Sequence, residues 1–134
     1  MTKPVILCVD DEKFILQTLK RQLKAAFGDA YYYEVAQDAD EALELIIELT
    51  EAALIVIIIV SDWLMPGMRG DEFLIRVHQQ FPNIIKILMT GQGDEAAIER
   101  AYIEANLYCC LHKPWSKEEL IETIKSGLVQ FKKI

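Results

Sequence analysis

The hydrophobic and polar positions of this chain divide it into two kinds of segment that alternate from beginning to end. Short apolar runs of strand length are Val5–Val9, Tyr31–Ala36, Leu54–Ser61, Ile84–Met89 and Leu107–His112. Between them apolar residues recur every three or four positions, as in amphipathic helices, over Phe14–Phe27, Asp40–Leu49, Gly70–Phe81, Asp94–Ala105 and a last stretch that begins after Ser116. Strands that alternate with helices through short connections favour right-handed crossovers and a parallel sheet. The pattern predicts an α/β fold, a doubly wound five-stranded parallel sheet with helices on both faces.

Individual residues support these boundaries. The run Leu54–Ser61 is too uniformly apolar to have a solvent face, which is typical of a central strand covered on both sides. Gly28 follows the first helical stretch as a plausible C′ residue, and Pro82 ends the third. Ser116 is a favourable N-cap for the last helix.

Composition narrows the class of protein. The chain has 134 residues, is 52% apolar and carries a formal net charge of −7, so we expect one globular domain over residues 1–134 with no direct nucleic-acid binding. The cysteines (Cys8, Cys109 and Cys110) lie inside apolar runs and are odd in number, as expected of buried reduced thiols. No signal-type segment opens the chain, and its longest apolar run, Ala52–Val60, is too short to span a bilayer. We expect a cytoplasmic location and no membrane contact.

Charged residues follow three of the five apolar runs. Asp10 and Asp11 come directly after the first run, Asp62 ends the third, and Lys113 follows the fifth. The carboxyl ends of parallel strands meet at one edge of the sheet, where ligands bind. Three carboxylates at short range repel one another, whereas Mg²⁺ takes oxygen ligands and keeps room for water and a phosphate oxygen. With Mg²⁺ and Lys113 the formal charges sum to zero, so the predicted site can accept an anion.

Each of these residues taken alone has a simpler explanation. Asp10 and Asp11 are good helix N-caps, and Asp62 suits the turn that follows it. Thr90 is unremarkable in a loop, and Lys113 before a proline is most often a solvated side chain. Their joint placement at four strand ends is what favours a functional site.

Four motifs together resemble the receiver domain of bacterial two-component response regulators, the CheY-like superfamily. They are Val9-Asp10-Asp11, Ser61–Gly70, Leu88–Gly91 and Lys113-Pro114-Trp115. The similarity runs from Pro4 to about Gly127. It implies a flavodoxin-like sheet with strand order 2-1-3-4-5.

The resemblance also implies a role for each motif. Asp62 would be the phosphoacceptor. Mg²⁺ would be bound by Asp11, Asp62 and the backbone carbonyl of Leu64, with Asp10 acting largely through water. Phosphoryl oxygens would be contacted by the switch residues Thr90 and Gly91 and by Lys113, and a cis peptide bond would precede Pro114.

The chemistry of these residue types agrees with those roles. A carboxylate is a competent nucleophile toward an activated phosphoryl group, and Mg²⁺ and Lys113 supply the charge that phosphoryl transfer requires. We therefore expect a signalling domain, not an enzyme in the ordinary sense, that catalyses only its own phosphorylation and dephosphorylation. Its donor would be a phosphohistidine on a sensor histidine kinase or a histidine phosphotransfer protein.

One residue position departs from the family pattern. Cys110 stands where receivers usually carry a large aromatic, and Tyr108 is expected on the same strand face as the nearest replacement. We therefore expect a muted conformational response. Leu64 and Gln92 border the expected path of the hydrolytic water, and because an apolar Leu64 cannot orient that water we expect slow self-dephosphorylation.

The last helical stretch is followed by Gln130–Ile134 and by no effector domain. The chain is either a stand-alone receiver or a part of a longer signalling protein. The absence of a clear C-cap favours the second interpretation.

Three other functions fit the sequence less well. A phosphatase of the haloacid-dehalogenase type needs a second acid two residues after the nucleophile, where this chain has Leu64. A nucleotide-binding Rossmann-like domain needs glycines in the first β/α turn, which reads Asp-Asp-Glu-Lys. A pure interaction module that has lost phosphorylation is disfavoured, because the chain keeps all five chemical positions: Asp10, Asp11, Asp62, Thr90 and Lys113.

Overall fold

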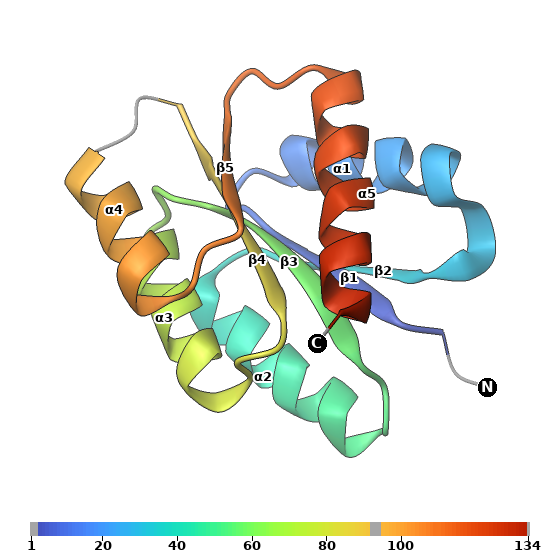
Figure 1. Cartoon of the computed structure of the whole chain (residues 1–134), viewed down its shortest axis with the longest axis horizontal. Coiled ribbons are helices and arrows are strands. Elements are labelled where there is room, and N and C mark those ends of the chain that lie inside the picture. The colour runs from blue at the N-terminus through green and yellow to red at the C-terminus, as the bar shows by residue number, and fades with distance from the viewer. Residues whose placement is uncertain (1–2, 92–94, 134) are drawn as a thin grey trace.

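Five parallel strands form the sheet of this protein in the order β2-β1-β3-β4-β5 (Figure 1). The computed structural model describes residues 3–91 and 95–133. The strands are β1 (Val5–Val9), β2 (Tyr32–Ala36), β3 (Val56–Asp62), β4 (Ile85–Thr90) and β5 (Cys109–His112). Every neighbouring pair is parallel. The predicted strand order is confirmed.

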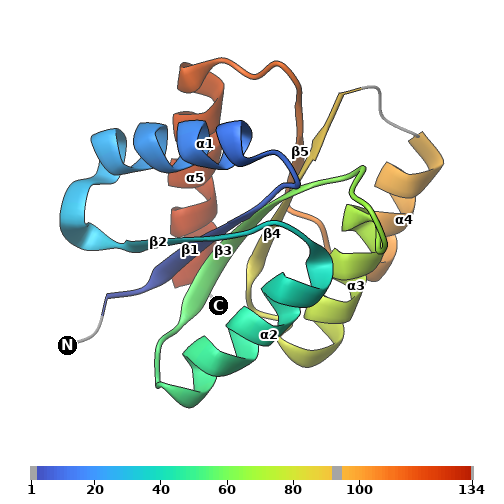
Figure 2. The same cartoon turned by 180° about the vertical axis from the view of Figure 1, so that it is seen from behind.

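Helices cover both faces of the sheet, as the alternating pattern predicted. They are α1 (Lys13–Phe27), α2 (Ala39–Glu51), α3 (Gly70–Gln80), α4 (Glu95–Glu104) and α5 (Lys117–Lys132), with a short 3₁₀ turn, η1 (Gly28–Ala30), after α1. Helices α1 and α5 lie on one face, and α2, α3 and α4 lie on the other (Figures 1 and 2). The doubly wound fold is confirmed.

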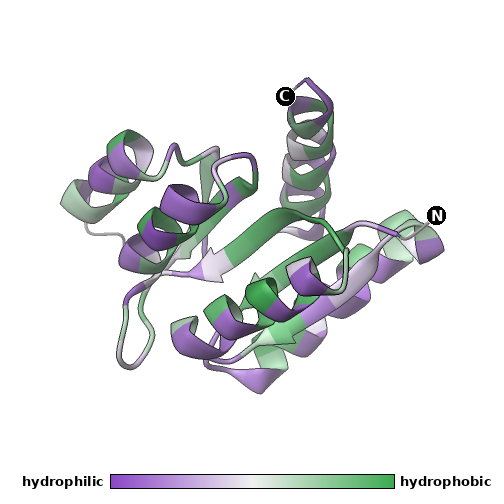
Figure 3. Ribbon diagram, turned by 90° about the horizontal axis from the view of Figure 1, so that it is seen from below, coloured by the Kyte–Doolittle hydropathy of each residue, from purple (hydrophilic) through white to green (hydrophobic). Residues whose placement is uncertain are grey.

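Two apolar cores lie on either side of the sheet. Alternate residues of β1 point to opposite cores: Leu7 packs with α2 and α3, whereas Ile6 packs with α1 and α5. Every residue of β3 is buried, so the prediction of a central strand covered on both sides is confirmed. Figure 3 shows the hydrophobic strands between helices whose outer faces are hydrophilic.

Side chains and glycine fix several helix ends. Gly28 follows α1 with a φ of 59° and donates its backbone N–H to the carbonyl of Lys24, a conformation that glycine adopts at little cost. Ser116 caps α5 by accepting the backbone N–H of Glu119 at 3.0 Å, as predicted. Asp38 caps α2 in the same way, so this helix begins one residue before the predicted Asp40.

Two strands, β3 and β5, begin two residues later than predicted. Ala53 adopts a φ of 63° and Leu54 donates its N–H to Leu49, so the chain is still leaving α2 and β3 starts only at Val56. Tyr108 lies just before β5, and its hydroxyl hydrogen-bonds to Ser126 of α5. The predicted start of the fourth helical stretch, Asp94, lies outside the described residues.

Among the described helices, none combines the length and the apolar character needed to cross a membrane.

Candidate functional site

Three carboxylates and one ammonium group meet at the carboxyl edge of the sheet. Asp10 follows β1, Asp62 ends β3 and Lys113 follows β5, so three strands contribute. Asp10, Asp11 and Asp62 each offer a carboxylate oxygen, and these oxygens lie within 4.8 Å of one another. Within residues 3–91 and 95–133 no other group of three or more His, Cys, Asp or Glu side chains converges in this way.

Lys113 bridges two of the carboxylates. Its Nζ lies 3.0 Å from Asp10 Oδ2 and 3.0 Å from Asp62 Oδ1. Its backbone N–H donates to the carbonyl of Thr90 at 2.7 Å, and the Lys113–Pro114 peptide bond is cis. Lys113 therefore contacts both Asp10 and Asp62 from a position just after the edge strand β5.

Burial sets the electrostatics of this pair. Burial raises the pKa of the Asp62 carboxyl, the hydrogen bond from Lys113 opposes this, and the charge of Asp10 adds to the increase. Burial alone would lower the pKa of the Lys113 ammonium, but its hydrogen bonds to Asp10 and Asp62, together with the charges of these carboxylates, raise it. One ammonium therefore does not fully compensate the carboxylates, and an added cation would favour ionised Asp62.

Asp10 and Asp11 differ in what their oxygens can still bind. Asp10 is fully buried, with Oδ1 accepting the N–H of Glu12 at 2.9 Å and Oδ2 accepting Lys113. Asp11 is exposed. The oxygens of Asp11 and the second oxygen of Asp62 are the hard donors that a divalent cation such as Mg²⁺ prefers, so the residues present fit this ion.

An open cleft lies above the cluster. Its lining comes from the β1–α1 and β3–α3 connections and from the ends of β4 and β5: Asp11, Glu12, Asp62, Trp63, Leu64, Met65, Pro66, Gly91 and Lys113. Leu64 is 63% exposed, so an apolar side chain borders the entrance.

The connection between β3 and α3 is held tightly against Asp62. Trp63 donates its backbone N–H to Met89, and its carbonyl accepts the N–H of Gly70 at 2.7 Å. A Cβ on Gly70 would lie 2.1 Å from the Asp62 carbonyl oxygen. Only glycine fits where α3 begins, and this close approach fixes the loop that borders the cleft.

Thr90 is buried, and its hydroxyl lies against β5. Its Oγ1 is 3.6 Å from Cys110 Sγ and 3.5 Å from His112 Nδ1. Burial raises the pKa of the Cys110 thiol, which the contact with Thr90 opposes. The strand period of two brings Cys110 and His112 to the same face.

Tyr108 does not share that environment. Because its hydroxyl reaches Ser126 and its ring packs in the core with α1 and α5, the expectation that it lies on the face of Cys110 is wrong. It precedes the regular strand, so the alternation of a strand does not govern its direction.

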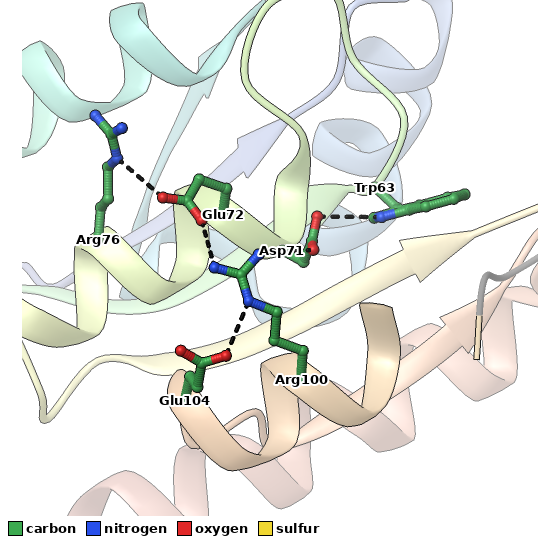
Figure 4. A network of polar contacts seen from close by, with 6 residues as sticks. All are labelled: Trp63, Asp71, Glu72, Arg76, Arg100 and Glu104. Carbon is green, nitrogen blue, oxygen red and sulfur yellow. Dashed lines mark hydrogen bonds and ion pairs between the residues drawn. The ribbon is translucent and has the colours of Figure 1, made fainter. Parts of the chain in front are cut away.

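A polar network beside the site was not foreseen from the sequence. Trp63, the residue after Asp62, donates its indole N–H to Asp71 on α3, and Arg100 on α4 reaches the same carboxylate (Figure 4). The spacing of Arg100 and Glu104 predicts an ion pair on a helix surface. The contact between α3 and α4 has no local signal. Gln92 lies outside the described residues.

Comparisons with known proteins show which family this chain resembles. Residues 6–125 match the model of the response regulator receiver domain family. The hydrogenase transcriptional regulatory protein HoxA of Cupriavidus necator is 32% identical over 123 residues, which cover 92% of this chain and 24% of that protein. Hybrid signal transduction histidine kinase D of Dictyostelium discoideum is 31% identical over 124 residues, 91% of this chain and 7% of that protein. The chain thus spans about a quarter or less of the length of these two relatives.

Solved structures show the same fold. The signal receiver domain of an HD domain-containing protein from Pseudomonas fluorescens Pf-5 has a TM-score of 0.87 and 34% identity, covering 99% of this chain and 100% of that one. The beryllofluoride-activated NtrC4 receiver domain dimer has a TM-score of 0.81 and 29% identity, with 95% and 98% coverage. The chain belongs to the response regulator receiver domain family, a signalling domain of two-component systems.

Proposed function

We propose that this domain accepts a phosphoryl group on Asp62, with Mg²⁺ as cofactor, from a phosphohistidine. The donor would be a cytoplasmic sensor histidine kinase domain or a histidine phosphotransfer protein. The observation that carries the proposal is the convergence of three carboxylates and Lys113 beneath an open cleft. Membership of the receiver family supports it.

The transfer uses the ionised carboxylate of Asp62. One carboxylate oxygen attacks the phosphorus, the O–P bond forms, and the P–N bond to the donor imidazole breaks. The imidazole leaves with the electron pair and takes up a proton. Lys113 Nζ lies 3.0 Å from Asp62 Oδ1, which supports its pairing with a phosphoryl oxygen, while bound Mg²⁺ would neutralise charge on the other oxygens.

Three groups would hold the ion directly: Asp11, Asp62 and the backbone carbonyl of Leu64. Asp10 would act through water. Both Asp10 oxygens already accept hydrogen bonds, from Glu12 and from Lys113, and a direct metal bond would have to displace one of them. The exposed carboxylate of Asp11 has no such constraint.

Thr90 and Gly91 would complete the phosphoryl contacts. The hydroxyl of Thr90 lies 3.6 Å from Cys110 Sγ, so a bond to the phosphoryl group would require it to turn away from β5. That turn would separate Thr90 from the Cys110 thiol and couple the site to β5. The resulting signal would pass to an effector domain, as the names of relatives that are transcriptional regulatory proteins suggest.

Phosphorylation in vitro tests this proposal. With acetyl phosphate and Mg²⁺, intact-mass measurement should find one phosphoryl group per chain. None is expected after chelation of the metal or in Asp62→Asn, whereas Asp29→Asn, which changes an exposed acid in η1, should react as the unmodified chain does. Asp11→Asn should weaken Mg²⁺ binding, since it removes a charged ligand.

Two further measurements, with a phosphomonoester as substrate and with Mg²⁺ alone, separate the other functions. Repeated hydrolysis of a phosphomonoester would indicate a phosphatase. A chain that binds Mg²⁺ but takes up no phosphoryl group would be an interaction module, and the proposal would then be abandoned.

A further inference from the structure

A chain of polar contacts runs from the residue after Asp62 to helix α4. Trp63 donates its indole Nε1–H to Asp71 Oδ1 at 3.1 Å, and Asp71 lies in the first turn of α3 with 6% of its surface exposed (Figure 4). The backbone of Trp63 is also fixed, through Met89 of β4 and Gly70 of α3. Asp71 therefore holds the free end of a side chain whose backbone borders the cleft.

Arg100 of α4 binds the other side of this network. Its Nη1 lies 3.8 Å from Asp71 Oδ2, Nη2 lies 2.8 Å from Glu72 Oε2, and Nε lies 2.8 Å from Glu104 Oε2. A planar guanidinium with several N–H groups can hold three carboxylates in fixed directions, which a lysine cannot. Figure 4 shows Arg100 between α3 and α4 with these carboxylates around it.

The ion pair between Arg100 and Asp71 contributes to the position of α4. An exposed ion pair normally contributes little, but Asp71 is buried and its charge needs a partner. Helix α4 buries the small side chains Ala97 and Ala101 and packs the partly buried Ile98 against the core, so its apolar contact with the fold is limited. The ion pairs of Arg100 add to this limited apolar contact in holding α4 against α3.

We propose that Asp71 and Arg100 are positioning residues for the connection from Trp63 to Arg69, so that the affinity of the carboxylate cluster for a divalent cation depends on where α4 lies. The proposal rests on the Mg²⁺ site proposed above. Leu64, the expected backbone ligand, follows Trp63 directly, and both residues line the cleft. A change that frees the Trp63 side chain loosens the segment that carries this ligand.

Linkage makes the coupling reciprocal. If the placement of α4 changes the cation affinity by some factor, cation binding changes the equilibrium between the positions of α4 by the same factor. This coupling runs through Trp63, Asp71 and Arg100, and it does not involve Cys110. It would connect the site to α4 in a chain that lacks the large aromatic residue on β5.

The sign of the effect separates positioning from simple electrostatics. Removing the positive charge of Arg100 takes away a repulsion for Mg²⁺, so electrostatics alone would strengthen cation binding. Loss of positioning would weaken it. Arg76 provides a matched control, since it also pairs with Glu72, at 3.5 Å, but it lies on α3 itself. Arg76→Gln makes the same charge change without releasing α4.

Mg²⁺ titration by calorimetry tests the proposal. Arg100→Gln and the uncharged change Trp63→Phe should each lower Mg²⁺ affinity by about tenfold, the range found for groups that orient metal ligands. The double variant should lose no more Mg²⁺ affinity than either single variant, because Arg100 and Trp63 both act through Asp71. Arg76→Gln should bind Mg²⁺ as the unmodified chain does or slightly more tightly. Equal or higher affinity in Arg100→Gln would overturn the proposal.

Amide exchange of the metal-free protein gives an independent readout. Arg100→Gln should speed amide exchange in the segment from Trp63 to Arg69 and leave exchange in β1 unchanged. Arg76→Gln should not change exchange in either segment. Unchanged exchange in that segment would also overturn the proposal. If the unmodified chain bound no Mg²⁺, the proposed function would fail, and this comparison would still decide whether Arg100 positions the segment.

Discussion

Lys86 shows what a single buried charge costs this fold. It lies in β4 with 1% of its surface exposed, and its ammonium donates to the carbonyl of Ile84 at 2.7 Å. Burial lowers the pKa of Lys86 from 10.5 to about 8. Burial of the imidazole, and then the charge of Lys86, lower the pKa of His78, whose buried Nδ1 has no hydrogen-bond partner within the described residues.

The sign of the pH dependence follows from that shift. Between about pH 8 and pH 10.5 the unfolded chain binds a proton on Lys86 that the folded chain does not, so the free energy of unfolding rises with pH in this window. Below pH 8 the cost of the buried charge is fully present. Lys86→Met should raise the stability at pH 7 by roughly 1 to 3 kcal/mol, less whatever the unpaired carbonyl of Ile84 costs.

Denaturant unfolding from pH 7 to pH 10 would check this. The difference between Lys86→Met and the unmodified chain should shrink as the pH rises, whereas Lys125→Met, at an exposed position of α5, should show no such trend. This role for Lys86 would be contradicted if Lys86→Met were less stable than the unmodified chain at pH 7 and its stability depended on pH in the same way.

The side chain of Leu64 is expected to affect how fast the phosphoryl group is lost. It is 63% exposed at the rim of the cleft, and an apolar group there cannot orient an attacking water. Leu64→Asn should speed loss of the phosphoryl group severalfold, measured as the decay of the phosphorylated mass after the donor is removed. Val129→Asn, an exposed apolar position on α5, should decay at the original rate. Slower or unchanged decay in Leu64→Asn would count against a shielding role.

At the scale of elements, the start of α3 is the most demanding junction. A Cβ on Gly70 would lie 2.1 Å from the backbone oxygen of Asp62, so Gly70→Ala must displace either β3 or the helix. We expect a loss of at least about 2 kcal/mol in stability, together with weaker Mg²⁺ binding. Gly91→Ala has nothing within 4 Å of its added Cβ and should unfold at nearly the same temperature as the unmodified chain. Equal stability of both variants would show that the junction yields easily.

Strand β5 affects how strongly the surface formed by α4, β5 and α5 responds to phosphorylation of the site. Cys110 contacts Thr90, but its side chain is too small to occupy the space that Thr90 would leave on turning toward a phosphoryl group. We expect beryllofluoride to change amide exchange in α4, β5 and α5 only modestly, and Cys110→Tyr to enlarge that change. Cys110→Ser, which keeps the size, should behave as the unmodified chain. A large change in the unmodified chain would show that Cys110 is no handicap, and that α4 responds by another route such as Arg100.

The elements also show where prediction from sequence stops. Strands and helices were predictable because their apolar periods differ, and Ser116 and Gly28 marked helix ends by local chemistry. Leu54 and Ile55 look like strand residues, but the left-handed turn at Ala53 keeps them out of β3. Tyr108 was placed on the wrong face because the strand begins only after it. Boundaries set by turns are weakly encoded in hydrophobic pattern.

For the whole molecule, the candidate site was predictable because it depends only on topology. Asp10, Asp62 and Lys113 each follow a strand, and a parallel sheet brings all strand ends to one edge. The contact of Arg100 with Asp71 was not predictable, since it depends on how α4 packs against α3. The direction of the Thr90 hydroxyl toward β5 likewise needs the three-dimensional structure.

The most direct measurement for the whole account is the identity of the residue that carries the phosphoryl group. An acyl phosphate on aspartate is reduced by borohydride, which leaves homoserine in the chain, so peptide mapping by mass spectrometry can name the position. After reaction with a phosphohistidine donor and Mg²⁺, we expect homoserine at Asp62, with Asp10 and Asp11 unmodified. Homoserine at another aspartate, or a phosphoryl group held on His78 or His112, would contradict the assignment of Asp62 as the acceptor.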